Sequence, residues 1–122
     1  MVDLKRTGNI SLLGRGTDAK IFGFGIKIVE SSNIIVRNIE FADCRVEEKD
    51  ALTIDRSRNI WIDHCSFSDD PDIDPERDDH DELLDIKKGS HNVTISSNTW
   101  ESIFFVFLIC CDPTVKVINM YA

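Results

Sequence analysis

Apolar and polar residues alternate along this chain in short segments that recur at intervals. Each copy begins with a small or polar residue, often asparagine, continues with two apolar residues separated by one position, and ends in a polar turn. The alternation has a period of two residues, which predicts β-strands. The copies lie at 9–12, 33–36, 59–62 and 92–95, with a weaker one at 114–117.

A second alternating segment precedes most copies by about eight residues, and the two kinds of segment together indicate the fold. These second segments lie at 26–28, 52–54, 84–86 and 107–109. Copies separated by roughly 22–33 residues, without a helical pattern between them, are typical of a solenoid with loops of variable length. We therefore predict an all-β, right-handed parallel β-helix of about five coils, whose equivalent strands stack about 4.8 Å apart.

The predicted stacking has consequences for individual residues. Four aliphatic residues should form one internal column, namely Ile34, Ile60, Val93 and Val115. Four others should share one turn position, namely Asn38, His64, Ser97 and Asn119. An antiparallel β-sandwich is the alternative fold. It is disfavoured because the chain lacks the turn dipeptides of hairpins and because the copies resemble one another closely.

Composition narrows the possible partners. The 122 residues carry a net charge of −8 and can form at most one small domain, which we take as 1–122. This charge makes a nucleic-acid partner improbable and leaves cation binding open. The chain contains no apolar run long enough to span a membrane. The four cysteines lack the spacing of a zinc site.

Carboxylates cluster at the start of two of the predicted strands. Asp50 precedes segment 52–54, while Asp81 and Glu82 precede segment 84–86, one coil later. If the two strands stack in register, these carboxylates come together, with Asp85 on the outward side and Glu48 on the same edge. Such groups repel one another unless a cation intervenes, and oxygen ligands of high charge suit Ca²⁺. The sequence therefore predicts a calcium site.

Several of these features have simpler interpretations. The acidic stretch 69–79 is best explained as a solvated loop. Asp81 would lie about 13 Å from Asp85 along a straight strand, so we expect Asp81 in a loop or bulge. His64 could act as a general base, but a hydrogen-bonded structural role in the turn is favoured. Trp61 should lie on the outer face, where it could stack on a sugar or cover the scaffold.

Two sequence motifs resemble polysaccharide lyase family 1, the pectate lyases and pectin lyases. They are Trp-Ile-Asp-His at 61–64, followed by Ser-Phe-Ser-Asp, and Leu-Asp-Ile-Lys-Lys-Gly-Ser at 84–90. The resemblance covers residues 9–99, is strongest over 31–99, and leaves 101–122 as an atypical tail. It implies a parallel β-helix that cleaves α-1,4-polygalacturonate by Ca²⁺-dependent β-elimination. It also implies an acidic polysaccharide partner and an extracellular location, and we expect a monomer.

The resemblance also implies roles for individual residues. Asp50, Asp81 and Asp85 correspond to the calcium-binding aspartates of the family, and Glu48 matches a position that is acidic in some members. Lys87, within the second motif, is the candidate for contact with the substrate. In this family the metal acts as a Lewis acid on the substrate carboxylate, and an arginine removes the neighbouring proton.

Three departures from the family pattern concern catalysis. Glu82 stands where the family usually has glycine after the second aspartate, and Phe105 stands where it has a substrate-binding lysine. The arginine base belongs to a later coil that the chain does not reach, so we assign no catalytic residue. We therefore expect a chain without the full catalytic machinery. The alternatives are a non-catalytic module that binds calcium and acidic polysaccharide, and a truncated product without function.

Overall fold

The computed structural model describes residues 2–42, 51–68, 84–101, 107–109 and 115–118. Within these ranges every regular element is a β-strand, and every strand pairing is parallel. No helix in the described ranges is long and apolar enough to cross a membrane.

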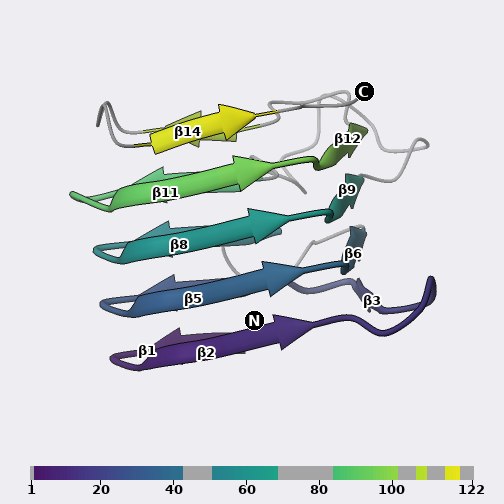
Figure 1. Cartoon of the computed structure of the whole chain (residues 1–122), viewed down its shortest axis with the longest axis horizontal. Coiled ribbons are helices and arrows are strands. Elements are labelled where there is room, and N and C mark those ends of the chain that lie inside the picture. Colours follow the sequence, from purple (N-terminus) through teal and green to yellow (C-terminus); the bar gives the residue numbers. More distant parts are fainter. Residues whose placement is uncertain (1, 43–50, 69–83, 102–106, 110–114, 119–122) are drawn as a thin grey trace.

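The strands form three parallel sheets, and successive coils add one strand to each (Figure 1). The first sheet contains, in spatial order, β1 (Val2–Lys5), β4 (Ile26–Val29), β7 (Leu52–Asp55), β10 (Leu84–Lys87) and β13 (Phe107–Ile109). The second contains β2 (Gly8–Leu13), β5 (Ser32–Arg37), β8 (Arg58–Asp63), β11 (His91–Ser96) and β14 (Val115–Ile118). The third contains β3 (Lys20–Phe22), β6 (Glu40–Ala42), β9 (Ser66–Ser68) and β12 (Thr99–Glu101).

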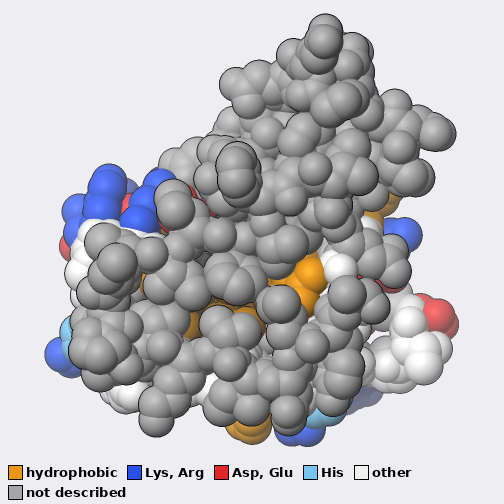
Figure 2. Space-filling view, turned by 90° about the horizontal axis from the view of Figure 1, so that it is seen from above, with side chains coloured by type: hydrophobic (Ala, Val, Ile, Leu, Met, Phe, Trp, Pro, Cys, Tyr) orange, Lys and Arg blue, Asp and Glu red, His pale blue; other side chains and the backbone are white. Residues whose placement is uncertain are grey.

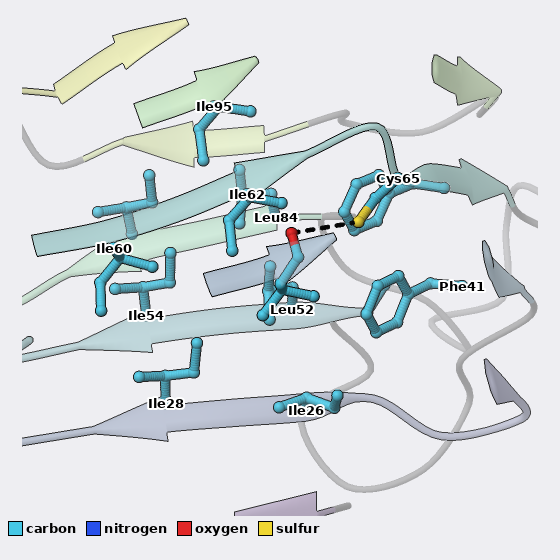
Figure 3. Packing of buried hydrophobic residues seen from close by; sticks show 14 of the residues in the cluster. Ile26, Ile28, Phe41, Leu52, Ile54, Ile60, Ile62, Cys65, Leu84 and Ile95 are labelled. Atoms are coloured by element: carbon cyan, nitrogen blue, oxygen red, sulfur yellow. Dashed lines mark hydrogen bonds between the residues drawn. The ribbon is translucent and has the colours of Figure 1, made fainter. Parts of the chain in front are cut away.

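This arrangement is a parallel β-helix and confirms the predicted fold class. The register of the second sheet is the predicted one, because Ile34 pairs with Ile60, Ile60 with Val93, and Val93 with Val115. The first sheet follows the same rule, with Ile28 beside Ile54 and Ile54 beside Ile86. Inward-facing aliphatic residues of both sheets fill the interior, as Figure 3 shows for Ile28, Ile54, Ile60 and others.

Four of the repeats open with an asparagine at the start of a strand of the second sheet, where the backbone favours this residue. Asn9, Asn33, Asn59 and Asn92 all adopt left-handed backbone conformations, with φ between 53° and 58°. Asparagine tolerates this conformation better than most residues. Their side chains also form a ladder between coils: Asn33 donates to Asn9 at 2.9 Å, Asn59 donates to Asn33 at 3.2 Å, and Asn92 donates to Asn59.

The predicted shared turn position is confirmed for the three members that the structure describes. Asn38, His64 and Ser97 have φ values of 59°, 51° and 54°. The fourth, Asn119, lies outside the described residues. The asparagine at this position fixes the turn further, because Asn38 donates to the carbonyls of Gly14 and Gly16 at 3.0 and 2.9 Å.

An aromatic column, which the repeat pattern did not reveal, lines the third sheet. Phe67 stacks between Phe41, at a centroid distance of 5.1 Å, and Trp100, at 4.4 Å. All three side chains are buried. Cys65, also buried, lies close by and points its thiol at the Val36 carbonyl (Figure 3). Burial raises the pKa of this thiol to about 11, so it is protonated at neutral pH.

Candidate functional site

The outward side of β10 carries the charged residues of the predicted calcium site that the structure describes. Leu84 and Ile86 point into the core and are fully buried, so the alternation of the strand turns Asp85 and Lys87 to the other side. Lys87 Nζ lies 3.5 Å from Asp85 Oδ2. The pair thus brings a carboxylate and an ammonium group together on the first sheet.

Asp85 is less exposed to solvent than an outward-facing residue is expected to be. Its exposed fraction is only 7%, and Thr53, its neighbour on β7, is fully buried. Both of these outward side chains are therefore largely removed from water. A carboxylate removed from water in this way needs a compensating positive charge, and Lys87 provides one.

The other predicted ligands, Glu48, Asp50 and Asp81, lie outside the described residues, as do Glu82 and Phe105. Within the described part of the chain, no three metal-ligating side chains gather in one place. The strand register on which the calcium site depends is nevertheless as predicted, because Leu52 pairs with Leu84. The calcium site itself stays a prediction.

A second polar cluster, which we call the Asp63 cluster, lies on the second sheet. Arg37, Asp63 and Ser96 occupy the same position on three adjacent strands. Asp63 is 3% exposed and accepts hydrogen bonds from Ser96 Oγ at 2.7 Å and His64 Nδ1 at 2.6 Å, while Arg37 Nε lies 3.2 Å away. Trp61 completes the cluster by donating to Ser96 Oγ at 2.8 Å.

Electrostatics keep Asp63 ionised. Burial by itself would raise the pKa of this carboxyl, but the hydrogen bonds from His64 and Ser96 and the charges of His64 and Arg37 outweigh burial, so the pKa is lowered. The favoured interpretation of His64 as a hydrogen-bonded residue of the turn is confirmed. Trp61 lies on the outer face, as expected, with 38% of its surface exposed.

Sequence reasoning missed the partners of Asp63. The signal that could have identified them is the strand register: once Ile60 is aligned with Ile34 and Val93, Asp63 falls beside Arg37 and Ser96. Cross-strand neighbours of this kind are within reach of a hydrogen bond or ion pair. The Asp63 cluster belongs to a different sheet from Asp85, so the two candidate sites are built on separate faces of the β-helix.

Fold and sequence comparisons agree on one class of protein, the parallel β-helix polysaccharide lyases. The family model for pectate lyase matches residues 4–114. Pectate lyase A of Emericella nidulans is 41% identical over 90 residues, which are 74% of this chain and 27% of that protein. Pectate trisaccharide-lyase of Bacillus licheniformis is 37% identical over 98 residues, which are 80% of this chain and 28% of that enzyme.

Among solved structures, pectate lyase Bsp165PelA from Bacillus sp. N165, in complex with trigalacturonate, superposes with a TM-score of 0.78 at 26% identity. The superposition covers 97% of this chain and 40% of that one. These matches establish that the chain belongs to the pectate lyase family. It spans less than a third of the length of the curated relatives described above.

Proposed function

We propose that this chain supplies the part of a pectate lyase that binds calcium and the acidic polysaccharide polygalacturonate. The family reaction is Ca²⁺-dependent β-elimination of α-1,4-polygalacturonate. The observation that carries the proposal is the Asp85–Lys87 pair on the outward side of β10, in a chain of this family. A uronate polymer needs cations for its carboxylates, and Lys87 and a bound metal ion would both provide them.

The residues fit a calcium ion by their chemistry. Asp85 offers carboxylate oxygens on the side of the strand that faces away from the core, and Asp50, Asp81 and Glu48 would add further oxygen ligands. Ca²⁺ accepts six to eight such oxygens in flexible geometry. When bound, the ion would act as a Lewis acid toward a substrate carboxylate. Lys87 would then orient that carboxylate, since its ammonium group already lies within 4 Å of the candidate ligand Asp85.

Two experiments test this proposal. Trigalacturonate binding to the chain, followed by calorimetry, should require Ca²⁺ and should weaken at least tenfold in Asp85→Asn. Asp18→Asn is the matched control, because Asp18 is an exposed carboxylate between β2 and β3 and should leave binding unchanged. Binding that ignores both Ca²⁺ and Asp85 would refute the proposal.

The second experiment addresses turnover. Because Phe105 stands where the family has a lysine, we expect the chain alone to bind polygalacturonate without efficient elimination. Incubation with polygalacturonate and Ca²⁺, followed by ultraviolet absorbance of the unsaturated product, measures this directly. Rapid formation of unsaturated product would overturn the expectation, and binding without product would favour the non-catalytic module.

We further propose that the chain acts outside the cell, since a polysaccharide of this kind is an extracellular polymer. We also propose that the chain is a monomer. Size-exclusion chromatography with light scattering should give a mass near 13.9 kDa. Fractionation of the producing cells should recover the protein in the medium. A stable dimer, or retention inside the cell, would contradict these two statements.

A further inference from the structure

A shallow hollow of about 400 Å³ lies where the first sheet turns into the second. It extends over three coils, because its walls come from the turns after β4, β7 and β10. The lining side chains that matter here are basic, namely Arg56, Arg58, Lys88 and His91. We call them the basic square. Figure 2 shows Lys and Arg side chains gathered at the left edge of the molecule, where Figure 1 places these turns.

The strand register brings the four residues of the basic square into two stacked pairs. Arg58 pairs with His91 across β8 and β11. Arg56 and Lys88 directly follow Asp55 and Lys87, which are partners across β7 and β10. Members of each pair are therefore about one strand spacing apart, roughly 4.8 Å. Arg56 and Lys88 are both cations and repel each other at this distance, so their arrangement is destabilising unless anions compensate it.

Two carboxylates compensate one half of the basic square. Asp55 is 1% exposed, and Arg56 Nε lies 2.9 Å and Lys88 Nζ 3.8 Å from its oxygens. Glu30 adds a contact of 3.5 Å to Arg56. These pairs hold Arg56 and Lys88 in the lining of the hollow, although 49% and 61% of their side-chain surfaces remain accessible.

Arg58 and His91 form the other half of the square and have no such compensation. Both are exposed, and neither makes an ion pair in the described part of the chain. His91 directs Nδ1 at the Gly89 carbonyl, 3.1 Å away, so Nε2 takes no part in that contact. Gly89, with φ of 80°, contributes no side chain, and a Cβ there would meet no atom within 4 Å, so the hollow stays open on that side.

The local charge contrasts with that of the whole protein. Three Lys and Arg side chains and one carboxylate, Glu30, line the hollow, and the buried Asp55 pairs with two of the three cations, whereas the chain as a whole carries a net charge of −8. A surface site lined mainly by cations raises the local concentration of anionic ligands, and each cation can contact one carboxylate of a polyanion. A guanidinium group binds a carboxylate through two parallel hydrogen bonds, which favours carboxylate ligands.

We propose that the basic square is a calcium-independent site for the carboxylates of an acidic polysaccharide, separate from Asp85. The choice of a uronate chain as ligand rests on the function proposed above. Arg58 and His91 bind carboxylates of the polymer, while Arg56 and Lys88, held by Asp55, offer further hydrogen-bond donors beside them. A long polysaccharide can then contact the protein both here and on the outward side of β10.

The test measures oligogalacturonate binding to the whole chain by calorimetry, at low salt and with EDTA to remove Ca²⁺. The unmodified chain should bind weakly, and Arg58→Glu should lower the affinity about tenfold or more, as expected for loss of a charged hydrogen bond. The matched control is Arg15→Glu, which makes the same charge change at an exposed residue between β2 and β3. It should change the affinity less than twofold.

Further arms separate the possible outcomes. Fully methyl-esterified oligomer should not bind in EDTA, and added NaCl should weaken binding of the acid form. Two results with the variants would overturn the proposal: equal losses of affinity in Arg58→Glu and Arg15→Glu, or unchanged binding in Arg58→Glu. Two results with the unmodified chain in EDTA would also overturn it: binding of the methyl ester, or no binding of the acid form. If EDTA-resistant binding is lost in Arg58→Glu but Ca²⁺ adds nothing, the inference holds and the calcium proposal fails. Matching thermal unfolding curves would exclude misfolding.

Discussion

The aromatic column of the third sheet makes a quantitative prediction about stability. Phe67 is 1% exposed and lies between two other rings, so Phe67→Ala removes both stacking contacts and leaves a cavity in the middle of the column. A buried phenylalanine removes about 150–250 Å² from water. At about 25 cal/mol per Å², this area corresponds to about 4–6 kcal/mol as an upper bound. Truncations of this kind typically cost about 3–5 kcal/mol.

The assay for this prediction is urea unfolding followed by far-UV circular dichroism. We expect Phe67→Ala to lower the free energy of unfolding by about 4 kcal/mol, a large part of the stability of an ordinary domain. Phe22→Ala is the matched control: Phe22 belongs to the same sheet but is 62% exposed, and its loss should cost less than about 1 kcal/mol. Equal losses in the two variants would refute the reasoning, because burial would then not decide the cost.

Three further predictions concern the turns and the Asp63 cluster. Gly14→Ala should abolish folding or destabilise strongly in the same unfolding assay, because a Cβ there would lie 1.9 Å from the Asn38 carbonyl oxygen; a variant as stable as the parent would contradict this. Asn59→Ala should cost about 1–2 kcal/mol because its φ is 56°, and Asn59→Gly should cost less, since glycine adopts this conformation freely; the reverse order would argue against backbone strain. Asp63→Asn should destabilise at pH 7 by about 1–3 kcal/mol. Because the folded-state pKa of Asp63 lies below its unfolded value, this carboxylate stabilises above the unfolded pKa and loses its effect as pH falls through the folded pKa. The difference between Asp63→Asn and the parent should therefore shrink with acidification, and a difference independent of pH would count against the role given to this charge.

Much of the fold could be predicted, because aligning the sequence repeats shows which residues pair between neighbouring strands. Aligning the asparagines that open each copy places Ile34, Ile60 and Val93 in one column, and the structure has the same pairing. The sequence pattern places these asparagines at the starts of strands, but their left-handed conformation and their ladder become visible only in the structure.

The third sheet was harder to predict for a physical reason. Its strands are three residues long, too short for alternation to register as a periodic pattern, and loops of different length separate them. The stacking of Phe41, Phe67 and Trp100 therefore becomes visible only in three dimensions.

The candidate sites also have some features that the sequence predicts and others that it does not. The pairing of Leu52 with Leu84 follows from the repeat, and it fixes the strand that carries Asp85. The low exposure of Asp85 could not be deduced, because the alternation of the strand predicts only that this side chain faces away from the core. The basic square was missed because its members belong to two turns about 30 residues apart in sequence, which come together only when the coils stack.

The central claim is that Ca²⁺ links Asp85 to a uronate ligand on the outward side of β10. A crystal of the chain grown with Ca²⁺ and trigalacturonate tests it most directly. Anomalous scattering should locate a calcium ion about 2.3–2.6 Å from a carboxylate oxygen of Asp85, in contact with a carboxylate of the trisaccharide. Trigalacturonate bound in the crystal with no calcium ion at Asp85 would contradict the account.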